Sequence, residues 1–496
     1  MPDLYIYNSY TRQKEKFEPI TPGYVGLYVC GPTVSGESHM GHARPYVTFD
    51  LVNRYLRHLG YKVRYVRNIT DAGHFEEEGR EAEDKVATKA KLERLEPMEL
   101  VTKYTNLFHW AMRLFNNLEP SIEPTATGHI IEQIDMIQKI MEKGYAYEKN
   151  GSVYFDVKKY AADYPYGKLS GRVLDELLET TRDLEGQDEK NNKVDFALWK
   201  KAPVEHIMRW NSPWGEGFPG WHIECSAMSS KYLGETFDVH GGGMDLQFPH
   251  HESEIAQSTI AHGHPPVRYW MHNNMITING KKMGKSYNNV IKLSELFTGD
   301  HPILEQAYHP MVIRFYILQT HYRSTLDFSN EALLASEKAF RRLWEAYEVL
   351  QKLKRNEGAA SDVTLDAEVQ KWCAECEEFM CDDLNTAKVI ANLFEIAPVI
   401  NGIKGGQVKA DALSADTYEL MLATFKTYLE DIMGMQALQV QQNNKLEQVL
   451  SLLIEMRKEA RTRKDFATSD QIRNRLAEAG IQLKDEKDGT VSYTID

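Results

Sequence analysis

Two histidines, His39 and His42, stand on either side of Gly41, shortly after a strand-like run that ends at Cys30. Residues three positions apart lie on one face of a helix, so both imidazoles can reach the same phosphate group. A helix that begins here adds unsatisfied N–H donors and a partial positive charge. The tetrapeptide alone also fits a helix-surface pair with no ligand, but its place directly after a strand favours a phosphate site.

A second charged segment, Lys282–Ser286 (KMGKS), lies much later in the chain. It follows an apolar strand-like piece and an Asn-Gly pair, which together suit a loop that can close. A mobile cation such as Lys282 or Lys285 would stabilise the charge that develops when an acid attacks the α-phosphate of ATP. The five residues alone are equally compatible with solvated surface.

Four residues have the donor atoms of a zinc site: Cys30, Cys225, His250 and Glu254. His250 and Glu254 are four positions apart on a predicted helix and therefore share a face. Two thiolates, one imidazole and one carboxylate can hold Zn²⁺ at ordinary distances. Buried small cysteines and a core histidine are the alternative that the residue types leave open. We expect the later pair, Cys373 and Cys376, to be structural.

Composition limits the kind of protein. A chain of 496 residues with 42% hydrophobic residues should form about three globular domains and contains no apolar run long enough to span a membrane. Five cysteines and the absence of signal-peptide features favour the cytoplasm. A net charge of −14 argues against a nonspecific nucleic-acid coat. The basic segment 457–464 fits either a local RNA contact or a solvated helix face.

Local patterns predict a strand over Val25–Cys30, a helix from Gly41 to Leu59 and a strand over Lys62–Thr70. Strand, helix and strand in this order form a βαβ unit, which predicts a doubly wound parallel sheet with its ligand site at the carboxyl edge. The same character returns at Phe237–His240, followed by three glycines and a helix from about His251. Beyond residue 330 the pattern is helical.

With these segments assembled, the sequence resembles the cysteinyl-tRNA synthetases, which are class I aminoacyl-tRNA synthetases, along essentially its whole length. The matching stretches are Cys30–Val34 (CGPTV), His39–Arg44 (HMGHAR), Asn68–Asp71 (NITD), Phe218–Met228 (FPGWHIECSAM), Asp238–Glu254 (DVHGGGMDLQFPHHESE), Lys282–Ser286 (KMGKS), Asp382–Thr386 (DDLNT) and Lys464–Ala467 (KDFA).

The resemblance implies that L-cysteine reacts with ATP, supplied with Mg²⁺, to give cysteinyl adenylate, and that the acyl group then passes to tRNA(Cys). It assigns roles to four groups of residues. ATP handling falls to His39, His42, Asp245 and Lys285, catalysis to His39, His42, Lys282 and Lys285, the cysteine pocket to Thr70, Trp221, His222, His240 and His251, and one zinc ion to Cys30, Cys225, His250 and Glu254.

The resemblance also implies an order of domains and a monomer. We expect a Rossmann-like catalytic domain in two halves, 1–119 and 206–330, separated by a connective insertion, 120–205. A helical-bundle tRNA-binding domain, 331–438, and a small anticodon-binding module, 439–496, complete the chain.

A zinc ion would serve to distinguish cysteine from serine. A purely steric pocket separates these two amino acids poorly, whereas a soft metal binds thiolate better than hydroxyl. The sequence departs from the family at Gly284, where serine is usual, and in an acidic insertion over residues 72–83 that contains His74, which we place on the surface.

Two alternative functions share parts of this evidence. One is a tRNA-independent cysteine ligase with the same adenylate chemistry, and the other is a noncatalytic zinc protein that binds RNA.

Overall fold

The computed structural model divides the chain into two compact units, residues 1–436 and 437–496. It describes residues 2–72, 76–77, 80–81, 89–90, 95–173, 190–203, 206–284, 287–353, 358–438, 442–463, 465–485 and 491–495. Lys285, His74 and Lys464 lie outside the described residues, so the predictions made for them stay predictions.

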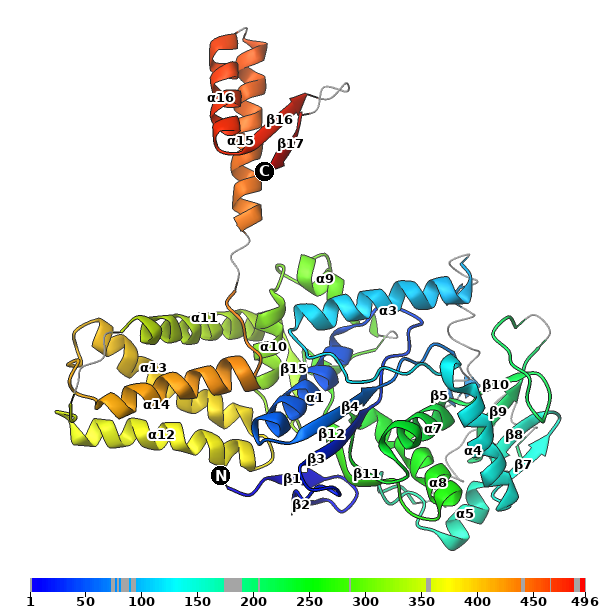
Figure 1. The fold of residues 1–496 in the computed structure, drawn as a ribbon. Coiled ribbons are helices and arrows are strands. Elements are labelled where there is room, and N and C mark those ends of the chain that lie inside the picture. Colours follow the sequence, from blue (N-terminus) through cyan, green and yellow to red (C-terminus); the bar gives the residue numbers. More distant parts are fainter. Residues whose placement is uncertain are drawn as a thin grey trace. The chain divides into compact units, whose positions relative to one another are not determined.

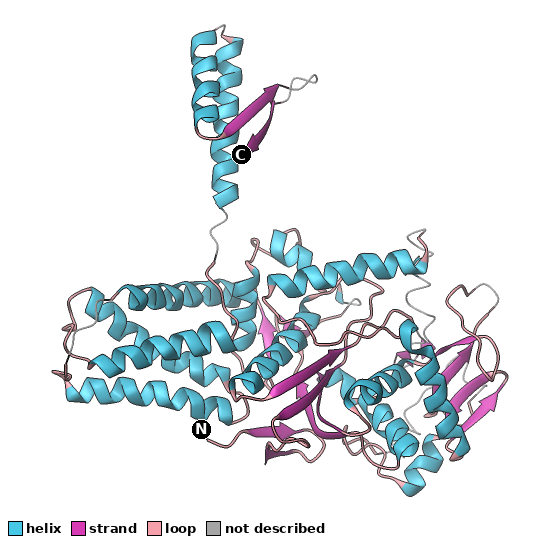
Figure 2. Ribbon diagram, in the orientation of Figure 1, coloured by secondary structure: helices cyan, strands magenta, loops and turns pink. Residues whose placement is uncertain are grey.

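A four-stranded parallel sheet forms the centre of the first unit, in the order β12-β11-β3-β4 (Figures 1 and 2). The predicted βαβ unit is confirmed, because α1 connects two neighbouring strands of this sheet. The elements are β3 (Tyr24–Val29), α1 (Met40–His58), β4 (Lys62–Arg67), α7 (Trp221–Leu233), β11 (Phe237–Gly243), α8 (His250–His262) and β12 (Val267–Asn273).

The three glycines Gly241–Gly243 belong to β11, which extends beyond the strand-like segment Phe237–His240. A Cβ on Gly241 would lie 2.2 Å from the ring of Phe49 in α1, and one on Gly242 would lie 2.7 Å from the ring of His251 in α8. Successive residues of a strand face opposite sides of a sheet. Helices α1 and α8 therefore cover opposite faces of β11, and both approach its backbone closely.

A second, antiparallel sheet in the order β10-β9-β8-β7 takes three strands from the insertion, and its edge strand β10 lies after residue 205, where we expected the insertion to end. Its apolar face packs with α7 and α8 in one core cluster, which includes Phe155, Trp199, Ile223 and Ile260. The insertion thus packs against α7 and α8 and stabilises their positions. The elements of the insertion and of this sheet are η1 (Thr127–His129), α4 (Ile130–Glu142), β7 (Ala146–Lys149), β8 (Ser152–Phe155), α5 (Val157–Asp163), β9 (Phe196–Lys201) and β10 (Gly217–Pro219).

The remaining short elements of the first unit surround the parallel sheet. Strands β13 and β14 form a hairpin that pairs with β15, and β5 pairs with β6 within the acidic insertion. These elements are β1 (Tyr5–Asn8), β2 (Gln13–Lys16), β5 (Glu76–Glu77), β6 (Arg80–Glu81), α3 (Pro97–Leu114), η3 (Met244–Gln247), β13 (Ile276–Ile278), β14 (Lys281–Lys282), α9 (Leu293–Thr298), α10 (Pro310–Leu318) and β15 (Leu326–Phe328).

The first unit ends in a bundle of helices, as the sequence predicts (Figure 1). The bundle comprises α11 (Asn330–Lys352), α12 (Val363–Cys381), α13 (Thr386–Lys404), α14 (Ala415–Phe425) and the π-helix η5 (Lys426–Ile432). Cys373, Cys376 and Cys381 are buried in α12, consistent with a structural part. Among the described residues, no helix has both the length and the apolar character needed to cross a bilayer.

The second unit packs two helices against a hairpin around Leu450, Leu476, Ile481 and Leu483. The two strands of this unit pair antiparallel. The elements are α15 (Gln442–Thr462), α16 (Phe466–Glu478), β16 (Ile481–Asp485) and β17 (Val491–Ile495).

Candidate active site

The first histidine pair lies at the N-terminus of α1, at the carboxyl edge of the parallel sheet. His39 is the N-cap, its backbone N–H donates to His42 Nδ1 at 3.1 Å, and the two rings stack with centroids 3.8 Å apart. Burial and the neighbouring His39 lower the pKa of His42 to about 3. A neutral His42 imidazole at a helix N-terminus offers an N–H group to an anion without carrying a charge of its own.

The second signature segment meets this pair directly. The Met283 side chain occupies the space above Gly41, where an added Cβ would lie only 2.5 Å from Met283 Cε. Just beyond the loop, His39 and Lys292 form an isolated antiparallel bridge, and Met40 N–H donates to the Ile291 carbonyl at 3.0 Å. The structure therefore brings the two distant segments together.

The four predicted metal ligands form a buried cluster between β3, α7 and α8. Their donor atoms all lie within 4.8 Å of one another. Cys30 Sγ is 3.8 Å from Cys225 Sγ and 3.7 Å from Glu254 Oε1, and His250 Nε2 is 3.2 Å from Glu254 Oε1. Donors around a tetrahedral zinc ion lie roughly 3.3–3.8 Å from one another. The spacing and chemistry of the four groups therefore fit zinc.

A second set of four overlaps the first, with His240 and His251 in place of Cys225 and His250. In this set His240 Nε2 lies 2.9 Å from Glu254 Oε2, the carboxylate oxygen that faces away from the thiols. His251 Nε2 lies 3.3 Å from Cys30 Sγ, while its Nδ1 lies 2.7 Å from a ring nitrogen of His272. His240 thus contacts Glu254, and His251 contacts Cys30, from outside the first set of four residues.

Burial and the contacts within the cluster shift the pKa values of its four groups in different directions. Burial would raise the pKa of Cys225, but the hydrogen bond from Cys30 and the proximity of His250 lower it to about 6. Burial likewise opposes ionisation of Glu254, yet His240 and His250 lower its pKa to about 2. Burial raises the pKa of the Cys30 thiol well above its usual range, and, against the effect of burial, Cys225 and Glu254 raise the pKa of His250 to about 10. The cluster therefore pairs two anionic groups, Cys225 and Glu254, with a protonated His250, and metal binding would have to release the protons of His250 and Cys30.

The expected substrate pocket adjoins the cluster. The Trp221 ring lies 4.4 Å from that of His250, and His222 Nδ1 lies 3.0 Å from His250 Nδ1. Thr70 reaches the same place through its hydroxyl, which donates to Glu224 Oε2 at 2.9 Å. Sequence reasoning missed Glu224, although it directly precedes Cys225.

Two more residues behind the cluster were also missed. His272 in β12 bridges His251 to Ser9, with 2.9 Å between its Nδ1 and Ser9 Oγ. Neither residue stands in a recognisable motif, and only the sheet topology brings them to the site.

Comparisons with known families and proteins cover nearly the whole chain. Residues 16–338 match the model described as "tRNA synthetases class I (C) catalytic domain", and residues 375–439 match the DALR domain. A protein of Bacteroides thetaiotaomicron named cysteine–tRNA ligase is 58% identical over 98% of both chains, and one of Chlorobaculum tepidum with the same name is 48% identical over 99% of this chain and 98% of its own.

The chain belongs to the cysteine–tRNA ligases. It is a class I aminoacyl-tRNA synthetase that charges tRNA(Cys), with the expected α/β catalytic fold followed by a helical domain.

Solved structures of other synthetases share the fold at low identity. A methionyl-tRNA synthetase of Mycobacterium tuberculosis in complex with methionyl-adenylate has a TM-score of 0.55 at 14% identity, covering 82% of this chain and 90% of its own. A putative arginyl-tRNA synthetase of Campylobacter jejuni has a TM-score of 0.56 at 13% identity, covering 85% and 94%.

Two predicted residues of the synthetase lie apart from the buried cluster. Lys282 ends the β13–β14 hairpin with an exposed side chain, and its carbonyl accepts a 3.1 Å hydrogen bond from Asn289 Nδ2. Asp245 is exposed on η3, at the end of the glycine-rich strand. The structure therefore leaves both available for a ligand from solvent without defining a contact.

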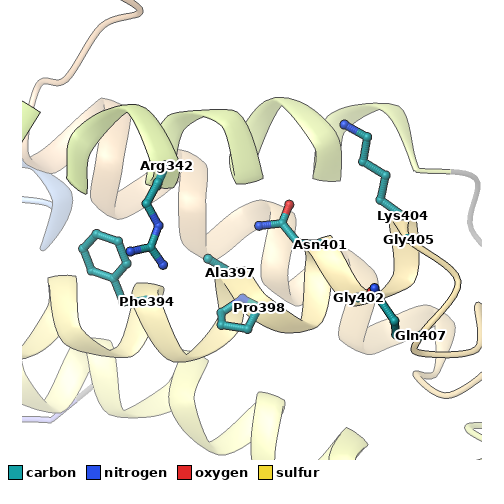
Figure 3. Close-up of a pocket in the computed structure, with 9 residues that line it drawn as sticks. All are labelled: Arg342, Phe394, Ala397, Pro398, Asn401, Gly402, Lys404, Gly405 and Gln407. Atoms are coloured by element: carbon teal, nitrogen blue, oxygen red, sulfur yellow. The ribbon is translucent and has the colours of Figure 1, made fainter. Parts of the chain in front are cut away.

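The helical domain of the synthetase carries an open pocket of about 680 Å³ between α11 and α13. Figure 3 shows Arg342 extending from α11 toward Phe394 of α13, with 5.9 Å between its guanidinium carbon and the ring centroid. Asn401, Lys404 and Gln407 line the other part of the pocket. The lining therefore combines two cations with amide groups.

Proposed function

We propose that cysteine activation takes place at the carboxyl edge of the parallel sheet, with the phosphates of ATP at the start of α1 and the cysteine thiol beside Cys30 and Cys225. The observation that supports this is the junction of three elements: the stacked His39–His42 pair, the Met283 loop above Gly41, and the buried cluster one strand away. Each of these features alone is common in proteins, but together they can bind both reactants of an adenylation, ATP and cysteine.

In this proposal Cys30, Cys225, His250 and Glu254 hold one zinc ion. We prefer this set to the overlapping one because it contributes two sulfur donors, and because His240 then acts on Glu254 as an outer hydrogen-bond partner of the kind that orients metal ligands. Bound zinc would supply a soft Lewis acid that prefers the thiolate of cysteine to the hydroxyl of serine.

The protein's own groups perform the remaining tasks. His39 and His42 donate hydrogen bonds to ATP phosphate oxygens, aided by the partial positive charge at the N-terminus of α1. Lys282 and Lys285 approach the same phosphates from the loop, with Mg²⁺ as a further counter-charge, and stabilise the charge that develops at the α-phosphorus. Thr70, Trp221, His222, His240 and His251 enclose the amino acid, and Asp245 contacts the nucleotide.

The helical and C-terminal parts take the RNA. We assign residues 1–119 and 206–330 to catalysis, 120–205 to a connective insertion, 331–438 to tRNA binding and 439–496 to the anticodon. Arg342 and Lys404 in the open pocket, and the exposed Lys458, Arg461 and Arg463 of the second unit, are suited to phosphate groups of a backbone. A tRNA-independent ligase would have no need of these surfaces.

The proposal includes a monomer that acts in the cytoplasm. Its test is cysteine-dependent exchange of pyrophosphate into ATP, measured beside aminoacylation of purified tRNA(Cys) and zinc analysis of the same preparation. We expect both activities and one zinc ion per chain. Exchange without aminoacylation would favour the tRNA-independent ligase, and RNA binding without exchange would favour a noncatalytic zinc protein.

A further inference from the structure

Glu224 is a buried carboxylic acid at the centre of the candidate site. It lies in the first turn of α7, directly before Cys225, and its residue has no exposed surface. Burial and the adjacent Cys225 raise the pKa of Glu224 well above its usual range. The proposed roles of the site do not use it.

One oxygen of Glu224 is held firmly. Oε2 accepts from the Thr70 hydroxyl at 2.9 Å, and the Thr70 hydroxyl in turn accepts from Asn68 Nδ2 at 3.1 Å. Asn68 Oδ1 receives the Gly31 N–H at 2.8 Å. The carboxyl group is therefore fixed to the loop that follows Cys30, and its orientation is determined.

The other oxygen has no partner. Among the buried side-chain carboxylate oxygens of the described residues, Glu224 Oε1 alone lacks a hydrogen-bond donor. Other buried acids have donors for both oxygens: both oxygens of Asp71 accept from Thr127, and both oxygens of Asp50 and Asp238 also have donors. Burying an acceptor without a donor is unfavourable, so such an atom in a site calls for a ligand that completes it.

We propose that Glu224 Oε1 receives the α-ammonium group of the substrate cysteine. An ammonium group supplies both a positive charge and several donors, which is what a buried carboxylate oxygen lacks. In cysteine the nitrogen and the sulfur are attached to adjacent carbons. A receptor for the nitrogen must therefore lie beside the receptor for the sulfur, as Glu224 lies beside Cys225.

The inference, which rests on the proposed function of this site, makes Glu224 a determinant of specificity. A thiol acid without an amino group gains nothing from Oε1, whereas cysteine gains a charge-assisted hydrogen bond. The pocket would thus select thiol and ammonium together and reject free thiols of other metabolites.

The experiment compares Glu224→Gln with the unchanged enzyme in pyrophosphate exchange. Two ligands are used: cysteine as substrate, and 3-mercaptopropionate, which lacks only the amino group, as competitive inhibitor. We expect the KM for cysteine to rise roughly 10- to 100-fold, as the loss of a hydrogen bond to a charged group does. The inhibition constant of 3-mercaptopropionate, the KM for ATP and the zinc content should stay unchanged.

The matched control is Glu252→Gln, a buried acid on α8 whose Oε2 accepts from both Ser170 N and Ser170 Oγ at 3.0 Å. It should leave the ratio of the two ligand constants unchanged. Equal weakening of both ligands in Glu224→Gln would overturn the inference, because it would show that Glu224 only positions Thr70. No weakening of either would overturn it as well, because an ordered water would then satisfy Oε1. Failure of the unchanged enzyme to exchange would instead refute the proposed function.

Discussion

A buried ion pair between α1 and α10 ties the catalytic sheet to the end of the helical bundle. Asp50 Oδ2 lies 2.5 Å from a terminal nitrogen of Arg314 and 2.8 Å from Arg54 Nε, while Oδ1 accepts from Leu118 N–H at 2.7 Å. Arg314 is entirely buried and also donates to the Met433 carbonyl at 2.6 Å. Four stretches of chain therefore converge on one carboxylate.

We predict that Asp50→Asn destabilises the first unit strongly. Asparagine keeps the shape but removes the charge, which leaves the buried guanidinium of Arg314 without a counter-ion. Breaking a buried pair in this way costs about 3–5 kcal/mol. The unfolding entropy of a unit the size of residues 1–436 is on the order of 0.9 kcal/mol/K, so the melting temperature should fall by roughly 3–6 °C.

Thermal unfolding followed by circular dichroism, together with urea unfolding, measures this change. The control is Asp382→Asn, which removes an exposed pair with Lys14 whose side chains are 49% and 41% exposed. Exposed pairs contribute about 0–1 kcal/mol, so the control should shift the melting temperature by about 1 °C or less. Equal shifts in the two variants would refute the argument from burial.

Three further predictions concern charge and metal. Burial would raise the pKa of Glu123, but hydrogen bonds from His109 and Arg67 keep it below its ordinary value of 4.5. The interaction therefore stabilises the fold above that pH and is lost as pH falls through the folded-state pKa, so Glu123→Gln should lower the melting temperature at neutral pH and have less effect as the pH falls below the folded-state pKa. Cys225→Ser should abolish both zinc content and cysteine activation while ATP binding persists, and a metal-free variant that still rejects serine would contradict this. Lys285→Ala should slow adenylation about 10²-fold in single-turnover measurements, and unchanged kinetics would remove the lysine from the mechanism.

Local sequence patterns predicted the elements of the catalytic core well, because these elements have regular apolar patterns and clear ends. Tyr24–Val29 and Met40–His58 follow the predicted strand and helix closely, since apolar periodicity and a clear end at Gly60 decide them. The extension of β11 through the three glycines could not be predicted from local sequence. Its backbone must admit Phe49 on one side and His251 on the other, and no local pattern encodes neighbours so distant in sequence.

The residues of the candidate site also divide into those that could be predicted from the sequence and those that could not. Cys30, Cys225, His250 and Glu254 could be selected from residue chemistry and resemblance, and the structure brings them together. Glu224 could not be selected, because an acid before a cysteine is unremarkable until burial and hydrogen bonds are known. Only the structure shows that one of its oxygens is held and the other is unpaired.

The arrangement around Arg44 explains how a closing loop can act without disturbing the histidine pair. Arg44, two residues after His42, is fully buried and donates to the Met275 carbonyl at 2.7 Å and to the Ser324 carbonyl. The base of the loop is therefore fixed to α1 by hydrogen bonds that are costly to break. Its tip touches Gly41 through the side chain of Met283, which is unbranched and adapts easily. In the proposed reaction, closure of the loop would therefore move its tip at Met283, while the hydrogen bonds of Arg44 keep the start of α1 in place.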